Sequence, residues 1–485
     1  MRFISTRGVS PAVSGPEAVL FGIAPDGGLY LPETLPRLDH LLSGPYSYAE
    51  LAAAVFRALL PGFTGEALDK AARAAYMGPF SSPDVTPLVP VGDDFVLELF
   101  HGPTAAFKDL ALQALPRLMA SAMSELAPGT DTLVLAATSG DTGSAAMKGF
   151  QGLPGFRVLV YYPALGVSAV QKSQMRTMSG DNVRAVGIRG DFDAAQAGVK
   201  AAFARAPELP PGIRLSSANS INIGRLIPQI VYYVHACREL TRLGRLKPGG
   251  LVDFIVPTGN FGDILAGYLA KQMGLPIGTL VCAANANRVL ADFMETGVYD
   301  ARRKLLPTLS PSMDILVSSN LERLLYLASD GDSGTVRGLM AELQTKGVYR
   351  ADKALMRAIR LDFSAASVSD AECLQAIRAV WEAHHYLMDP HTAAAWGAMG
   401  EMEESGRPRV VLATASPFKF PRAIFRALGL PAPVEDTALP ERLGELTGLS
   451  VPASLTGLDL LPVLHQDVIP GAAVSDDALK RAIVW

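Results

Sequence analysis

The sequence predicts an α/β protein whose sheets are mostly parallel and covered by helices. The main observation is a unit that recurs from residue 93 onward, in which an apolar, β-branched run is followed by a short polar loop and a helical pattern. The clearest copies lie at 93–115, 132–150, 251–274 and 409–429. Because strands that alternate with helices form right-handed βαβ units, these copies predict parallel sheets that are covered on both faces.

The other elements are assigned in chain order, beginning with a short strand-like segment at the N-terminus. A turn at Pro25-Asp26-Gly27-Gly28 and helical patterns at 47–60 and 65–77 come next, and the Pro- and Ser-rich stretch "MGPFSSPDVTPLVPVGDD" ends this region. Beyond it, the apolar runs "FRVLVYYP", "NVRAVGIRG" and "IGTLVCAAN" predict further buried strands.

The composition narrows the function classes. A chain of 485 residues predicts two or three packed units, and its 43 basic against 47 acidic residues give no general affinity for nucleic acid. The three cysteines are widely spaced, and no CxxC, HxxxH or HExxH pattern occurs, so we expect neither a disulfide framework nor a metal site. With no signal-like or membrane-spanning apolar run, we expect a cytoplasmic protein without a membrane partner.

Four polar loops that follow predicted strands form the candidate site. They are Gly102–Lys108, Thr138–Gly143, Thr258–Asp263 and Thr414–Lys419. Ligands of α/β sheets bind at the carboxyl ends of the strands, so these loops converge on one pocket if their strands are neighbours.

The loop Pro257–Asp263 suits a phosphate group. Its two glycines allow a close approach of the backbone, and the helix that follows offers unpaired N–H groups and the positive end of its dipole. It matches neither the Walker spacing nor GxGxxG. The alternative interpretation is a tight strand-to-helix turn without a ligand.

The loop in "ATSGDTGSAA" contains Asp141, whose carboxylate would repel a phosphate. This loop therefore suits an ammonium or hydroxyl group, or a carboxylate held by Thr138, Ser139, Thr142 and backbone N–H groups. The alternative is that Ser139 and Thr142 cap the next helix.

Lys108 stands near the start of a predicted helix, where the helix dipole disfavours a cation. Its neighbours Ala105, Ala106 and Phe107 are apolar, and burial helps an amine to lose its proton. An uncharged amine is what Schiff-base chemistry needs. The alternative is an ordinary solvated lysine.

A second anion site is predicted at "SSANSINIGRLIPQI", where polar side chains precede an apolar helix. The guanidinium of Arg225, with the donors of Ser217, Asn219, Ser220 and Asn222, suits a phosphate or carboxylate. Helix capping, with Arg225 on a solvated face, is the alternative.

Taken together, the stretches "APDGGLYLPE", "HGPTAAFKD", "ATSGDTGSAA", "SANSINIGR" and "PTGNFGD" resemble the signatures of the threonine synthases, in their long bacterial and fungal form. The resemblance extends to "ATASPFKF" near residue 420. It implies the architecture of fold type II pyridoxal phosphate enzymes, with two mostly parallel sheets covered by helices and an extra N-terminal α/β region. We expect an N-terminal domain at 1–90, a large cofactor-binding domain at 91–115 and 215–485, and a small mobile domain at 116–214.

The resemblance also implies roles for the loop residues. Lys108 would attach pyridoxal 5'-phosphate covalently and then act as the general base. The other cofactor-binding residues would be Phe107, Asp141, Gly259, Asn260, Phe261, Gly262, Asp263 and Thr414, the last on the pyridine nitrogen. The substrate would be O-phospho-L-homoserine, held by Thr104, Thr138, Ser139, Thr142, Ser217, Asn219, Asn222 and Arg225.

The implied reaction eliminates phosphate from Cγ and adds water at Cβ to give threonine. The sequence departs from the family at Ser416, usually histidine, and at Phe418, usually alanine, so a phospholyase that releases 2-oxobutyrate remains an alternative. A serine or threonine dehydratase is a more distant one, against which the second anion site argues. A non-catalytic cofactor-binding relative is a third, against which Lys108 argues. We expect a monomer with a small-molecule substrate.

Overall fold

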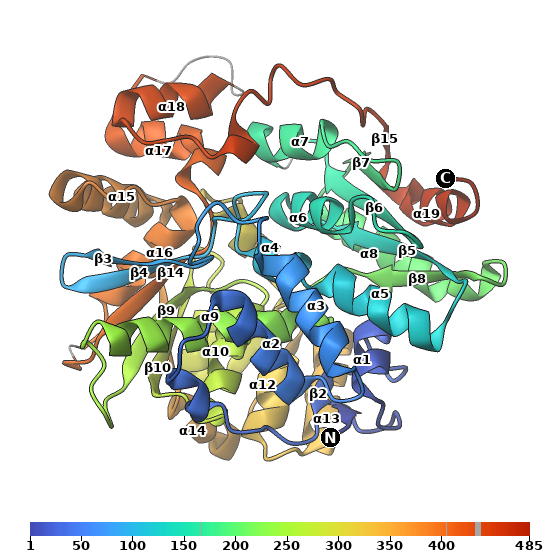
Figure 1. Cartoon of the computed structure of the whole chain (residues 1–485), viewed down its shortest axis with the longest axis horizontal. Helices are drawn as coiled ribbons and strands as arrows, with labels where there is room; N and C mark the ends of the chain where they lie inside the picture. The colour runs from blue at the N-terminus through green and yellow to red at the C-terminus, as the bar shows by residue number, and fades with distance from the viewer. Residues whose placement is uncertain (166, 404, 432–437) are drawn as a thin grey trace.

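The computed structural model, which describes residues 1–165, 167–403, 405–431 and 438–485, contains two mostly parallel sheets covered by helices (Figure 1). The larger sheet has the strand order β13-β10-β9-β14-β4-β3, in which the edge pair β3 and β4 is antiparallel. Its strands are β3 (Leu88–Val91), β4 (Asp94–Glu98), β9 (Val252–Pro257), β10 (Ile277–Ala284), β13 (Phe363–Ser367) and β14 (Arg409–Ala413). The predicted fold class is confirmed.

The smaller sheet has the order β15-β7-β6-β5-β8, with every pair parallel. Its strands are β5 (Asp131–Ala137), β6 (Phe156–Pro163), β7 (Val183–Arg189), β8 (Ile213–Ser217) and β15 (Val468–Pro470). Since β15 pairs with β7, and α19 (Val474–Ile483) packs on α8 (Phe192–Ala204), the C-terminal segment joins this sheet. This segment lies within the range 215–485 expected for the large domain, and the domain boundaries themselves stay a prediction.

The N-terminal region packs across both units. It contains the antiparallel pair β1 (Phe3–Ser5) and β2 (Tyr30–Pro32) and the helices α1 (Gly15–Phe21), α2 (Tyr48–Leu59) and α3 (Gly65–Tyr76), so the two predicted helices are confirmed. Helix α1 packs on α5 (Leu115–Leu126), and α2 packs on α9 (Ile223–Arg242). Capping boxes at Ser14 and Ser47 fix where α1 and α2 begin.

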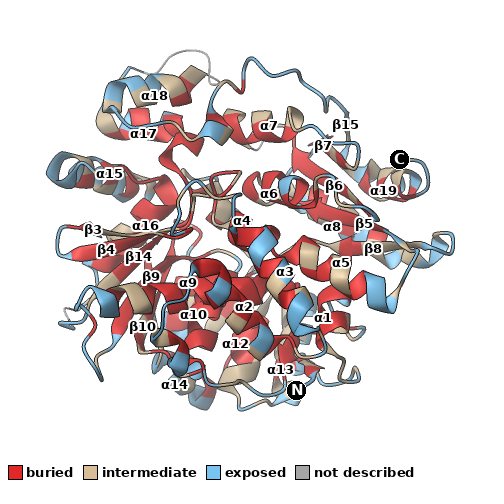
Figure 2. Ribbon diagram, in the orientation of Figure 1, coloured by how far each residue is buried: buried red, intermediate tan, exposed pale blue. Residues whose placement is uncertain are grey.

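The recurrent units appear as predicted, because each apolar run forms a buried strand and each polar loop leads into a helix. Figure 2 shows the central strands of both sheets, such as β9, β14, β5 and β6, buried between their helices. The helices of the four units include α4 (Lys108–Leu112), α6 (Asp141–Phe150), α10 (Gly262–Gln272) and α17 (Pro421–Leu428). The remaining helices are α7 (Ala169–Arg176), α11 (Val289–Thr296), α12 (Leu321–Ala328), α13 (Ser333–Lys346), α14 (Lys353–Arg360), α15 (Asp370–His384), α16 (Pro390–Gly400) and α18 (Leu439–Thr447), and a second antiparallel pair joins β11 (Val298–Asp300) to β12 (Val348–Arg350).

Strand order places the candidate loops together. Strands β4, β14 and β9 are neighbours, so the loops that follow them leave the same edge of the larger sheet. Helix α4 lies between the two sheets in the centre of the view in Figure 1, facing the unit that carries β5. Within the described ranges, no helix has the length and apolar character needed to cross a membrane.

Candidate active site

One cavity of about 760 Å³ is lined by residues from all four predicted loops or their ends, which confirms that the loops converge. The loops before Lys108 and after β14 lie against each other: Ala106 and Ala415 form an isolated antiparallel bridge, and Phe107 N donates to Thr414 O at 2.8 Å. The loop after β5 reaches the cavity from the smaller sheet. The cavity therefore lies between the two sheets.

Most of the predicted site residues line this cavity. They are Phe107, Lys108, Thr138, Ser139, Asp141, Thr142, Ser217, Asn219, Arg225, Gly259, Asn260, Phe261, Gly262, Asp263 and Thr414. The structure does not bring Thr104 and Asn222 to its wall. Thr104 Oγ1 donates to Asp109 Oδ1 at 2.8 Å, whereas Asn222 donates from Nδ2 to Val19 O at 2.9 Å and caps α9 by accepting from Gly224 N at 2.9 Å. Asn222 is therefore a helix cap and does not bind an anion in the cavity, as the alternative interpretation of this segment predicts.

Lys108 shares the Asp141 carboxylate with a second lysine, Lys419, for which the sequence predicts no role. Lys419 Nζ lies 2.7 Å from Asp141 Oδ1, and Lys108 Nζ lies 3.6 Å from Oδ2. Gln171 Nε2 and Ser312 Oγ also donate to this carboxylate, at 2.8 and 3.1 Å. Burial acts to raise the pKa of Asp141, but the two ammonium groups and the hydrogen bond from Gln171 hold the pKa well below its usual value. Asp141 is therefore a carboxylate at neutral pH.

Burial lowers the pKa of Lys108, since its ammonium form loses hydration in the cavity wall. Asp141 opposes this change, whereas the positive charges of Arg225 and Lys419 add to it. The side chain is only 13% exposed, and its Nζ lies 4.8 Å from the centre of the Phe107 ring. An ordinary solvated lysine is thus excluded, and an amine that can lose its proton is favoured.

The loop after β9 presents free backbone donors to the cavity. Among the described residues, no protein acceptor pairs with the N–H groups of residues 259–262, which lead into α10. Phe261 has a left-handed backbone, with φ of 62°, and a Cβ on Gly259 would lie 3.0 Å from Ser312 O. Free N–H groups at the positive end of a helix form an anion site. This geometry favours the phosphate interpretation over a turn without a ligand.

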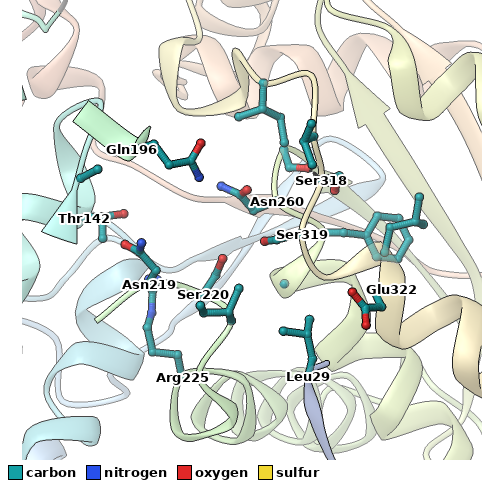
Figure 3. A pocket seen from close by; sticks show the side chains of 18 of the residues that line it. Leu29, Thr142, Gln196, Asn219, Ser220, Arg225, Asn260, Ser318, Ser319 and Glu322 are labelled. Atoms are coloured by element: carbon teal, nitrogen blue, oxygen red, sulfur yellow. Dashed lines mark hydrogen bonds between the residues drawn. The ribbon is translucent and has the colours of Figure 1, made fainter. Parts of the chain in front are cut away.

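Arg225 supplies the second predicted anion site. Its side chain is 3% exposed, its Nη1 donates to Ala218 O at 3.0 Å, and its Nε has no hydrogen-bond partner. No carboxylate pairs with it in the described part of the chain. Burial lowers the pKa of Arg225 to about 10, so the group is still a cation at neutral pH. Figure 3 shows Asn219 and Ser220 near Arg225, across the cavity from Ser319 and Glu322. A buried guanidinium without an acidic partner calls for an anion from solution.

Asp263 lines the cavity at the first turn of α10. Its Oδ1 accepts hydrogen bonds from Tyr232 and Tyr233, at 2.6 and 3.0 Å, and burial raises its pKa to about 6. The two phenols therefore fix one oxygen of the carboxyl group against α9.

The segment 308–320 was not predicted to belong to the site, although it covers the loop after β9. Ser318 Oγ donates to Gly259 O at 2.7 Å, and Ser312 N donates to Nε2 of the buried His391 at 3.2 Å. His391 Nδ1 in turn lies 2.5 Å from Asp389 Oδ2. The contacts of Ser318 with Gly259 and of Ser312 with His391 join residues far apart in sequence, and no local pattern marks them, so only the fold reveals them.

Ser416, the main departure from the family pattern, does not lie among the described residues that line the cavity. Its Oγ accepts from Phe418 N at 3.4 Å and caps the short 3-10 helix η4 (Pro417–Lys419). The serine therefore supports the turn that carries Lys419.

Gly140 permits the contact between Gln171 and Asp141. Its φ is 137°, and a Cβ there would lie 2.4 Å from Gln171 Cδ. We expect Gly140→Ala to lower the free energy of unfolding by about 1–3 kcal/mol through backbone strain, and to lower activity by displacing Gln171. Urea denaturation measures the first effect. As a control, Gly338→Ala in α13 adds a Cβ that meets no atom within 4 Å, and we expect a gain of about 0.5–1 kcal/mol. Equal stability changes in the two variants would contradict the assigned role of Gly140.

The chain is similar to known proteins of one family along its whole length. The family described as pyridoxal-phosphate dependent enzyme matches residues 85–415, and those described as threonine synthase N terminus and threonine synthase, C-terminal match residues 2–76 and 392–458. The threonine synthase of Pseudomonas aeruginosa is 43% identical over 451 residues, which cover 92% of this chain and 93% of that protein. The structure of pyridoxal-phosphate-bound threonine synthase from Brucella melitensis is 38% identical, with a TM-score of 0.87 over 100% of both chains. The yeast threonine synthase structure is 35% identical, with a TM-score of 0.88 over 99% of this chain and 98% of that one.

Proposed function

The chain belongs to the threonine synthases, pyridoxal-phosphate-dependent lyases that convert O-phospho-L-homoserine and water to L-threonine and phosphate, and we propose that the cavity around Lys108 is its active site. One observation carries the assignment of the site. Two separate anion sites, the N–H groups of residues 259–262 and the guanidinium of Arg225, lie in one cavity with a buried lysine. A phosphorylated cofactor and a phosphorylated substrate need two such sites.

The residues present fit pyridoxal phosphate. The free N–H groups of residues 259–262 would hold its phosphate, Lys108 would bind it covalently, and the Thr414 hydroxyl would face its pyridine nitrogen. When bound, the cofactor supplies an electron sink that makes protons on the substrate's carbon chain acidic.

The substrate is held at both ends in this proposal. Arg225, with Asn219 and Ser217, binds the phosphate of the substrate, because it is the buried cation without an acidic partner. Thr138 and Ser139, in the loop that leads into α6, hold the α-carboxylate. Binding at two points orients the reacting carbons toward Lys108.

Lys108 moves the protons. Its uncharged amine acts as the general base, first at Cα and then at Cβ, where it removes a proton from each carbon. The phosphate that leaves Cγ stays beside Arg225. Water adds at Cβ, so the site must admit water at that stage and exclude it earlier. We propose that the unit that carries α8 moves to open and close the site, because Gln196 of this helix lines the cavity (Figure 3). We also propose that the enzyme is monomeric and cytoplasmic.

A product assay tests the function. We incubate the purified protein with pyridoxal phosphate and O-phospho-L-homoserine and quantify phosphate, threonine and 2-oxobutyrate together. We expect one threonine for each phosphate released. Phosphate matched by 2-oxobutyrate would make the enzyme a phospholyase, and turnover of free serine or threonine without any phosphate release from phosphohomoserine would make it a dehydratase.

A further inference from the structure

A buried ion pair joins the two halves of the cavity. Lys419 follows β14 of the larger sheet, Asp141 follows β5 of the smaller sheet, and both side chains are almost fully buried. Lys419 Nζ also donates to Thr104 O at 2.8 Å. Its ammonium group is therefore held between two fixed oxygens, and an ammonium buried in this way needs such partners.

The two lysines compete for one carboxylate. Lys419 makes the short contact, at 2.7 Å, and Lys108 is left with a 3.6 Å contact to the other oxygen, which Ser312 also occupies. An opposite charge within a few ångström favours the charged form of an amine, by about 1–3 pKa units. Without Lys419, the undivided charge of Asp141 would act on Lys108 and hold it as an ammonium.

We propose that Lys419 is a positioning residue for the reaction: it holds the Asp141 carboxylate in a permanent ion pair and so leaves the Lys108 amine free to act in its uncharged form. The inference rests on the proposed attachment of the cofactor at Lys108.

Arg225 also lowers the pKa of Lys108, but among the described residues it makes no ion pair with Asp141, whereas Lys419 does. Besides Asp141 and Lys419, Arg225 from α9 and Asp263 from α10 interact electrostatically with Lys108, whereas the Asp109 carboxylate of α4 is hydrogen-bonded to Thr104. Burial raises the pKa of Asp109 and of Asp263 to about 6 and lowers the pKa of Arg225 to about 10. The midpoint is therefore compared between variants that differ only at position 419, in which these other groups are unchanged.

Three variants separate charge from packing. Lys419→Gln keeps a donor for Asp141 or Thr104 O but removes the charge, and Lys419→Arg keeps the charge. Lys148→Gln is the matched control, because Lys148 is exposed on the same helix as Asp141 and contacts Gln151. From each full-length holoenzyme we remove the cofactor and measure the rate constant of pyridoxal phosphate rebinding from about pH 6 to about pH 9. Visible absorbance follows the rebinding, and circular dichroism checks the fold.

If Lys419 has this role, removing its charge shifts the pH midpoint of the rebinding rate. In Lys419→Gln the midpoint of the rate profile is expected to move upward by about one pH unit or more, so that rebinding at pH 7 is about tenfold slower while the plateau at high pH is kept. Lys419→Arg and Lys148→Gln are expected to keep the wild-type midpoint. A rate lowered equally at every pH, with an unmoved midpoint, would overturn the proposal and leave Lys419 a packing residue.

Two further measurements keep the test decisive. If Lys419→Gln fails to fold, Lys419→Met supplies a charge-free side chain that suits a fully buried site, and the same upward shift is expected. Borohydride reduction and peptide mapping then identify the lysine that carries the cofactor. A label absent from Lys108 in the wild-type enzyme would refute the proposed attachment, whereas a label on Lys108 with unshifted midpoints would refute only the role of Lys419.

Discussion

Replacing Lys108 by alanine is expected to abolish threonine formation, with a fall in kcat of about 10³-fold or more, because it removes the group that moves protons at Cα and Cβ. It also removes the covalent attachment, so we expect the visible absorbance of the bound cofactor to change. The N–H groups of residues 259–262 remain, and some noncovalent binding of pyridoxal phosphate is expected to persist. Steady-state kinetics and a cofactor titration measure the two effects separately.

This variant is expected to fold, since the loss of Lys108 leaves no buried charge without a partner. Asp141 keeps Lys419 at 2.7 Å together with the donors Gln171 and Ser312. Lys148→Ala, which removes an exposed lysine, is the control for a change of charge and is expected to retain wild-type activity. Full activity in Lys108→Ala would show that the cofactor is attached elsewhere.

Much of the fold follows from local sequence patterns. Apolar runs such as 252–257 and 409–413 are long enough and β-branched enough to predict buried strands, and the glycine-containing loops after them mark where the helices begin. The C-terminal strand β15 was not predicted, because a three-residue run, "VIP", carries no periodicity. Only its pairing with β7 defines it as a strand.

The site residues that the sequence predicts lie within loop motifs. The residues that it does not predict are distant in sequence from the groups that they contact. Lys108, Asp141 and Gly259 stand in recognisable loops, and the structure brings all three to one cavity. Lys419 ends the predicted loop after β14 but has no predicted role there, and Ser312 lies outside the predicted loops, because only the fold brings both to Asp141. A buried lysine in an apolar segment after a strand was the available signal for Lys419, and it is the same signal that singled out Lys108.

Asn222 shows where a local pattern allows two interpretations. An asparagine ahead of a helix suits an anion site and also suits an N-cap, and the sequence cannot distinguish between them. The structure shows the cap, with Asn222 Oδ1 accepting from Gly224 N. Arg225, three residues later, points the other way: it is buried, it lines the cavity, and no described carboxylate pairs with it.

Replacing Arg225 by methionine is therefore expected to raise the KM for O-phospho-L-homoserine by about 10²-fold or more, because removing one partner of a buried, hydrogen-bonded charge pair costs about 2–5 kcal/mol. Inhibition by inorganic phosphate is expected to weaken in parallel, since the same guanidinium binds the product. The affinity for pyridoxal phosphate is expected to change little, because the N–H groups of residues 259–262 are untouched. Kinetics with both ligands and a cofactor titration measure these three quantities.

Arg238→Met is the matched control, because Arg238 lies on the same helix, outside the described cavity wall, and donates to Leu41 O and Gly44 O at 2.8 Å. We expect this variant to lose some stability while its KM stays at the wild-type value, since its contacts hold the N-terminal region and not a ligand. Arg225→Lys keeps the charge without the planar fork, so a partial recovery of KM relative to Arg225→Met is expected. If Arg225→Met weakened cofactor and substrate binding equally, Arg225 would belong to the cofactor site, and the substrate phosphate would need another partner. The large change in KM without a change in cofactor affinity is the result that ties this guanidinium to the substrate.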